Sequence, residues 1–86
     1  GIAHDLNEAR ITLAGLPDRP GAVAEIFRPL ASANINVDMI VQSVARPGEP
    51  SDLTFTVPTA SLPETVAELE KIKDKAGFAD IVTDTD

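Results

Sequence analysis

The hydrophobic pattern of this chain changes its period at one turn, residues 15–21, which reads Gly-Leu-Pro-Asp-Arg-Pro-Gly. Before the turn, residues 10–15 alternate between large apolar and smaller side chains, as in a half-buried strand. After it, apolar residues recur three and four positions apart, as on one face of a helix: Val23, Ile26, Phe27, Leu30 and Ala31. The first strand must therefore be followed directly by a helix, with Asp18 as the predicted N-cap.

The remaining segments repeat these two periods. Residues 35–44 and 52–57 have strand patterns around a turn-rich segment, residues 46–51, and predict an antiparallel hairpin. A second helix is predicted after Ser61, which forms a capping-box motif with Glu64, and residues 78–83 are a last strand. The order β-α-β-β-α-β predicts an α+β, ferredoxin-like sandwich, with a four-stranded antiparallel sheet and two helices on one face.

Three finer expectations follow from the same pattern. Pro29 should kink the first helix, and Asn34 should end it, because asparagine tolerates a left-handed backbone. Strict alternation in the second strand predicts one apolar face, made of Ile35, Val37, Met39 and Val41. Its other face should carry Asn36, Asp38, Ile40, Gln42 and Val44. The sheet face away from the helices should then hold Thr12, Ala14, Ile40, Val44, Thr54 and Thr56.

Composition excludes several function classes. Fourteen acidic against seven basic residues give a net charge of −7, which argues against nucleic acid and anionic membranes as partners. The sequence has no cysteine, and a metal site, a phosphate-binding loop or a nucleophilic serine motif is not expected. With no long apolar run or signal-peptide pattern, a cytoplasmic location is expected.

One constellation of residues suits a small zwitterion. The start of the first helix offers backbone N–H groups to a carboxylate, and Asp18 or Asp38 could pair with an ammonium. The βαββαβ order is expected to bring the turn, residues 18–23, close to Asn34, Asn36 and Asp38, with Gln42 on the Asp38 face. The residues by themselves leave open whether this end is a site or a polar corner.

Five stretches carry a resemblance to a known family. They are Leu16-Pro17-Asp18-Arg19-Pro20-Gly21, Ile26-Phe27, Leu30-Ala31, the run from Asn34 to Gln42 (Asn-Ile-Asn-Val-Asp-Met-Ile-Val-Gln) and the run from Asp52 to Pro58. Together they resemble the first ACT domain of the aspartokinases, over about residues 2–84. The resemblance implies a regulatory amino-acid-binding module that gives feedback inhibition of aspartate phosphorylation by lysine, threonine or both.

The resemblance also implies particular residues and partners. The effector contacts would fall on Asp18, Arg19, Pro20, Gly21, Ala22, Val23, Asn36, Val37, Asp38 and Gln42. Ser51 and Thr54 match hairpin positions whose substitution can loosen feedback. The domain itself would be non-catalytic and without cofactor, whereas the parent kinase would use ATP and Mg. Its partners would be the amino acid and a second ACT domain, or another copy in a homo-oligomer.

Residues 1–9 and two other functions complete the expectations. Residues 1–9 are expected to be a linker, or a strand belonging to the neighbouring ACT domain, with the ACT domain itself at residues 10–86. The first and last residues suggest a fragment of a longer chain. One alternative is a purely structural dimerisation module that uses the edge strand or the open sheet face. The other is a small hydrolase, for which Arg19 and Asn34 are the candidate pair.

Overall fold

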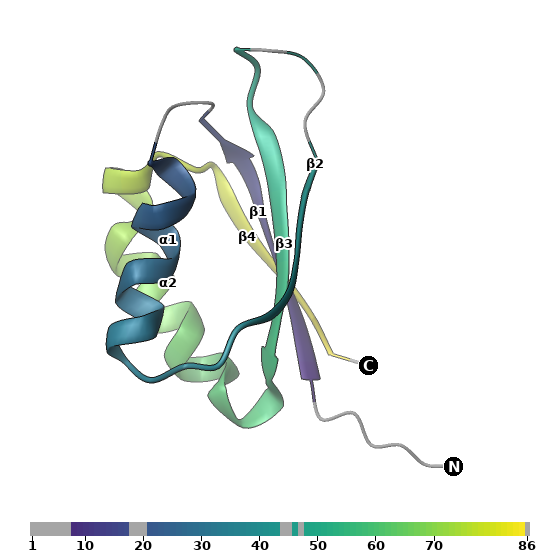
Figure 1. Ribbon diagram of the computed structural model, residues 1–86, viewed down its shortest axis with the longest axis vertical. Helices are drawn as coiled ribbons and strands as arrows, with labels where there is room; N and C mark the ends of the chain where they lie inside the picture. The colour runs from purple at the N-terminus through teal and green to yellow at the C-terminus, as the bar shows by residue number, and fades with distance from the viewer. Residues whose placement is uncertain (1–7, 18–20, 44–45, 47, 86) are drawn as a thin grey trace.

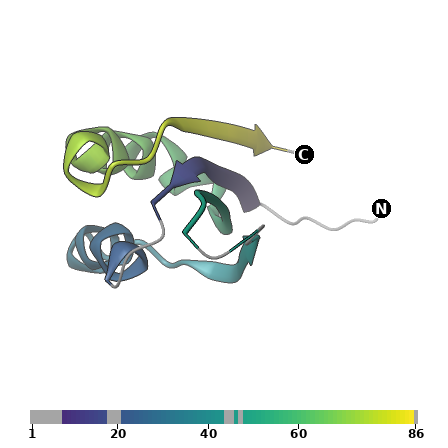
Figure 2. The same cartoon turned by 90° about the horizontal axis from the view of Figure 1, so that it is seen from above.

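The computed structural model describes residues 8–17, 21–43, 46 and 48–85. Its elements in chain order are β1 (Glu8–Leu16), α1 (Ala22–Ser32), β2 (Asp38–Ser43), β3 (Ser51–Pro58), a 3-10 turn η1 (Thr59–Ser61), α2 (Leu62–Ala76) and β4 (Asp80–Thr85). Both helices cover the same face of the sheet (Figures 1 and 2). The predicted ferredoxin-like βαββαβ sandwich is confirmed.

The sheet has the order β2-β3-β1-β4, and every neighbouring pair is antiparallel. The core lies between sheet and helices and is almost entirely aliphatic. Phe27 of α1 meets Phe55 of β3 edge to face, with ring centroids 5.1 Å apart. The first strand begins two residues earlier than expected, so that Ala9 is fully buried in this core. Residues 1–7 lie outside the described residues.

The N-cap of the first helix lies three residues later than predicted. Gly21, in a left-handed conformation with φ of 83°, occupies the N-cap, so the assignment of that position to Asp18 is wrong; Asp18 itself lies outside the described residues. The helix passes through Pro29 and ends at Ser32. Of the predicted stripe, Ile26 and Leu30 are buried, whereas Ala31 is exposed.

The end of α1 confirms the role of Asn34. This residue has φ of 65° and follows the C-cap, and its N–H donates to the Ala31 carbonyl over 3.0 Å. The Ile35 N–H donates to the Leu30 carbonyl, also over 3.0 Å. These two bonds form a Schellman motif, in which the buried Ile35 side chain follows the turn into the core.

The second helix starts without the predicted capping box. Ser61 has a helical backbone after the 3-10 turn, and its hydroxyl makes no cap bond. Its carbonyl instead accepts a hydrogen bond from the Thr65 hydroxyl over 2.8 Å. Leu69 and Ala76 are buried, and Gly77 ends the helix with φ of 85°.

A β-bulge at Met39 overturns the strict alternation predicted for the second strand. Asp38 pairs with Thr56 and Ile40 with Phe55, so Met39 is an extra residue without a cross-strand partner. Paired residues point to the same side of a sheet, which places Ile40 and Gln42 on the helix side with Phe55 and Leu53. Asp38 and Val41 lie on the opposite, open side, as partners of Thr56 and Thr54. Ile40 therefore does not belong to the open face, and Val44 lies outside the described residues.

Candidate functional site

The start of α1 lies at the end of the sheet where β1 finishes and the β2–β3 hairpin projects (Figure 1). Leu16, the last residue of β1, pairs with Ser51, the first of β3. Ser51 is only 5% exposed, and its hydroxyl accepts a hydrogen bond from the Gln42 side-chain amide over 3.3 Å. Ser51 thus pairs with β1, the strand that precedes the turn, and is hydrogen-bonded to Gln42 of the edge strand β2.

The helix start itself is accessible. Gly21 is exposed, and hydrogen bonding within the helix begins with the Glu25 N–H donating to the Gly21 carbonyl over 3.0 Å. The N–H groups of residues 22–24 therefore have no carbonyl one turn earlier within the helix. Ala22 is buried and Val23 is half-buried, so they fix the helix to the core. The predicted contact residues Asp18, Arg19 and Pro20 lie outside the described residues.

The segment between α2 and β4 makes close contacts with the residues on either side of this turn's start. The Ala79 N–H donates to the Ala14 carbonyl over 2.8 Å, and a Cβ on Gly15 would lie 2.9 Å from the Ala79 Cβ. A Cβ on Gly77 would lie 3.1 Å from Pro17. The strand that enters the turn thus packs on the segment between α2 and β4.

Asn34, Asn36, Val37 and Asp38 lie at the opposite end of the domain, so their predicted proximity to the helix start is wrong. They are separated because α1 runs along the length of the sheet before β2 begins (Figure 1). An 11-residue helix separates its two ends by about 16 Å. Asp38 instead lies across Thr56 from Arg10. Because of the bulge, Gln42 and Asp38 face opposite sides of the sheet. The prediction that Gln42 lies on the same face as Asp38 is therefore wrong.

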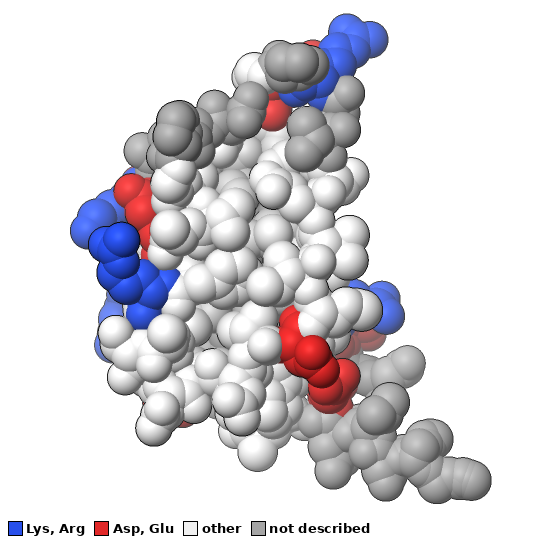
Figure 3. Space-filling view, in the orientation of Figure 1, with Lys and Arg blue, Asp and Glu red and all other residues white. Residues whose placement is uncertain are grey.

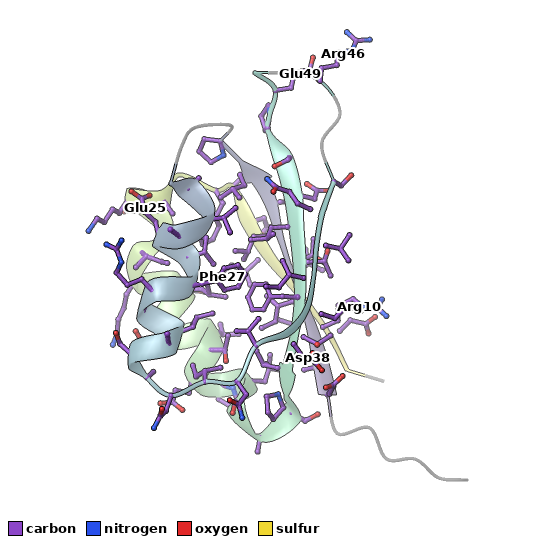
Figure 4. All side chains as sticks on the ribbon, viewed as in Figure 1. Arg10, Glu25, Phe27, Asp38, Arg46 and Glu49 are labelled. Carbon is purple, nitrogen blue, oxygen red and sulfur yellow. The ribbon has the colours of Figure 1, made fainter. Side chains whose placement is uncertain are left out.

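Around Asp38 the open face carries a row of polar residues from four strands. Arg10, on β1, lies 4.0 Å from the carboxylate of Asp84, and both side chains are well exposed. Asp38 accepts the N–H of Met39 over 3.0 Å. The hydroxyl of Thr56 is buried and has no hydrogen-bond partner among the described residues. Figure 4 shows Arg10 and Asp38 on the sheet side, away from the helices.

The two hairpin positions implied by the resemblance differ in location. Ser51 lies at the helix-start end, in contact with Gln42. Thr54 lies in the middle of the open face, where its hydroxyl is 3.0 Å from that of Thr12. Only Ser51 therefore belongs structurally to the helix-start end.

The edge strand β2 exposes three consecutive apolar residues. The sequence pattern predicted that they would lie alternately on the two faces of the sheet. Met39, Ile40 and Val41 are 53%, 54% and 52% exposed. Seen from the side of α1 and β2, the surface has a broad area without charged side chains (Figure 3). Three consecutive large apolar residues place apolar side chains on both faces of a strand, a pattern typical of a strand buried on both faces, so the sequence did not signal that this run is exposed.

The helix layer has a separate groove of about 460 Å³ between α1 and α2. Its lining combines Pro29, Ala33, Ile72 and Ala76 with the charged residues Glu25, Arg28, Glu68 and Lys75, and with Ser32. None of the effector candidates that the structure describes lines it. Within the described ranges there is no cluster of potential metal ligands and no helix long and apolar enough to cross a membrane.

Known proteins resemble the chain in both sequence and fold. Residues 10–74 match the family model described as the ACT domain. An aspartokinase from Mycolicibacterium smegmatis is 39% identical over 85 residues, which is 98% of this chain and 20% of that protein. The aspartokinase of Helicobacter pylori strain 26695 is 50% identical over 70 residues, or 81% of this chain and 17% of that protein. The chain thus spans about a fifth of the length of these relatives.

Solved structures agree with the sequence matches. A crystal structure of aspartokinase alpha and beta subunits superposes with a TM-score of 0.83 at 40% identity, over 93% of this chain and 51% of that one. The ligand-free regulatory subunit of aspartate kinase from Thermus thermophilus gives 0.82 at 37% identity, over 92% and 51%. The family match covers most of the chain, and the fold is the one found in aspartokinase regulatory subunits. The chain therefore belongs to the ACT domain family, as a regulatory domain of the aspartokinase type.

Proposed function

We propose that this domain binds a free amino acid at the start of α1 and couples that binding to feedback inhibition of an aspartokinase, with lysine or threonine as the effector. The observation that carries the proposal is that the open helix start lies at the same end of the sheet as the hydrogen-bonded pair Gln42 and Ser51, beside an uncharged edge. The ATP and Mg chemistry of aspartate phosphorylation would belong to the kinase part of the parent protein.

The helix start supplies the carboxylate half of the site. Backbone N–H groups of the first turn, together with the positive end of the helix dipole, favour an anion there. In this proposal the turn from Asp18 to Val23 surrounds the effector's carboxylate. Gln42 donates one amide hydrogen to Ser51, and its second amide hydrogen and its carbonyl oxygen are then available to an effector side chain.

The ammonium half comes from a second ACT domain. When two β2 edges pair antiparallel about a two-fold axis, the beginning of one strand lies beside the end of the other. Asn36 and Val37 of one domain then lie beside the end of β2 that carries Gln42 in its neighbour, whereas Asp38 lies on the open face of the joined sheet. Residues that the length of α1, about 16 Å, separates within one domain thus form a composite site across two domains.

The two edges of the sheet differ in their suitability for such pairing. The edge strand β2 exposes three consecutive apolar residues, Met39 to Val41, whereas β4 exposes one, Val82, between the exposed carboxylates Asp80 and Asp84. Charged residues on an edge strand oppose pairing with another chain, and exposed apolar residues favour it. Pairing through β2 is therefore the arrangement that this domain favours.

Regulation requires that the effector prefer one arrangement of two domains over another. Binding across a composite site meets this condition, because the effector contacts both domains only when they are correctly apposed. Calorimetric titration of lysine and threonine into the chain, at concentrations where it self-associates, should show saturable heat for at least one of them. No heat and no melting shift with either amino acid would contradict the proposal.

A mixing experiment tests the composite geometry. Ala24 is exposed in the first turn of α1, so Ala24→Glu places a competing carboxylate at the helix start, with Ala24→Gln as the neutral control. Asn36→Ala removes a proposed polar contact of the ammonium half. Ala24→Glu and Asn36→Ala should each bind no effector alone, whereas an equimolar mixture of the two should regain about a quarter of the wild-type capacity, because half of the dimers are mixed and one of their two sites is intact. No recovery would contradict a site shared between domains.

The alternative is a structural module that pairs through β2 without an effector. The exposed apolar run of β2 favours it as much as it favours the composite site. Under this alternative the chain self-associates, but neither lysine nor threonine gives heat when titrated into it. The calorimetric experiment therefore separates the two functions.

A further inference from the structure

Met39 combines three properties that point to a modification site. It is the only methionine in a chain that lacks cysteine, so its thioether is the only sulfur in the sequence. It is 53% exposed. It is also the extra residue of the β2 bulge, with φ of 21°, a backbone conformation that residues with side chains rarely adopt.

The preceding residue, Asp38, stabilises the bulge. The carboxylate of Asp38 accepts the Met39 N–H over 3.0 Å, so this N–H is bonded locally and not to a sheet partner. The residues on either side of Met39 pair with consecutive residues of β3, Thr56 and Phe55. The strand therefore projects Met39 beside Ile40 and Val41, in the apolar run of the open edge.

Exposed thioethers react with peroxides. The sulfur lone pair attacks one peroxide oxygen, the O–O bond breaks as the S–O bond forms, and the other oxygen leaves as water after proton transfer. The sulfur is oxidised by two electrons and hydrogen peroxide is reduced. The product is a polar sulfoxide with a strong hydrogen-bond acceptor in place of a flexible apolar group.

We propose that Met39 is an oxidation-sensitive site that controls pairing of the β2 edge, with peroxide as the oxidant. This inference rests on the proposed edge pairing and adds its chemical regulation. A sulfoxide within the apolar run would have to lose its hydration without gaining a donor when a second domain covers it, which opposes association. Conversely, a paired edge covers the thioether, so assembly protects Met39 from oxidation.

The experiment treats the chain with hydrogen peroxide and follows two readouts. Intact mass and peptide mapping measure the addition of one oxygen at Met39, and analytical ultracentrifugation measures self-association. Oxidation should weaken association by on the order of tenfold or more. At concentrations above the dissociation constant, oxidation should slow by a similar factor. Methionine sulfoxide reductase should restore association.

Three variants serve as controls. Met39→Leu keeps the apolar edge without sulfur and should associate normally and resist peroxide. Met39→Gln places a polar group at the same position and should associate weakly without oxidant. Ile40→Lys blocks the edge by charge and should prevent association in either redox state.

The outcomes separate this inference from the edge pairing on which it rests. Equal association before and after complete oxidation, with Ile40→Lys still disruptive, contradicts control by Met39 and leaves the edge pairing intact. If the chain does not self-associate, or if Ile40→Lys leaves its association unchanged, both the edge pairing and its control by Met39 are contradicted. Loss of association in peroxide-treated Met39→Leu would also overturn the assignment to Met39.

Discussion

Asp38 and Gln42 are four residues apart on the same strand, yet they face opposite sides of the sheet. Asp38 pairs with Thr56 on the open face, and Gln42 pairs with Leu53 on the helix face. An unbroken strand would place both on one side, and the extra residue Met39 reverses that relationship. A single bulge thus decides which residues of β2 can act together.

The buried hydroxyl of Thr56 has no partner among the described residues, which makes it a test of polar burial. Thr56→Val should leave the free energy of unfolding unchanged or raise it by up to about 1 kcal/mol, because an unpaired hydroxyl is replaced by a methyl group. Thr65→Val is the matched control, since the Thr65 hydroxyl donates to the Ser61 carbonyl over 2.8 Å. That variant should lose about 1 kcal/mol. Denaturant unfolding measures both, and a larger loss for Thr56→Val would mean that its hydroxyl is satisfied.

The contact between Gly15 and Ala79 predicts a difference between two glycines of similar backbone conformation. Gly15 and Gly48 have φ of 72° and 85°, and a Cβ on Gly48 would meet no described residue within 4 Å. Gly48→Ala should cost about 1–2 kcal/mol from the left-handed backbone alone. Gly15→Ala should cost about 1–3 kcal/mol more, because its Cβ collides with the Ala79 Cβ. Equal losses in denaturant unfolding would show that Ala79 yields easily.

The hydrogen bond between Gln42 and Ser51 predicts coupled substitutions. Gln42→Ala and Ser51→Ala should each lower the free energy of unfolding by about 0.5–1 kcal/mol. The double variant should lose less than the sum of the two, because both single variants remove the same bond. A complete double-mutant cycle by denaturant unfolding gives the coupling. Strict additivity would indicate that the bond contributes nothing measurable.

Asn34 provides a test of the helix end. Its φ of 65° is accessible to asparagine and glycine but strained for alanine, so Asn34→Ala should cost about 1 kcal/mol and Asn34→Gly much less. Asn36→Ala is the control, because Asn36 is exposed and has no left-handed backbone; its effect should stay within about 0.5 kcal/mol. Thermal unfolding that ranked Asn36→Ala below Asn34→Ala in stability would contradict this account.

Parts of the candidate site could be predicted from sequence because they depend on local chemistry. Asn34 ends α1 as predicted, since tolerance of a left-handed backbone is a property of the residue itself. The N-cap predicted at Asp18 is wrong, because Gly21 occupies that position. The second helix begins after Ser61 as predicted, but the Ser61 hydroxyl makes no cap bond, because Ser61 has the helical backbone of the preceding 3-10 turn.

Sequence alone determined the order of strands and helices, and with it the fold, because hydrophobic period and turn residues act over a few neighbouring positions. It also determined the acidic, cysteine-free character and the resemblance to ACT domains. Tertiary structure decided which candidate residues lie together. The direction of α1, which is about 16 Å long, carries Asn36–Asp38 to the end of the domain opposite the helix start. The register of β2 against β3 creates the bulge at Met39. Both outcomes depend on packing between segments distant in sequence, which no local pattern records.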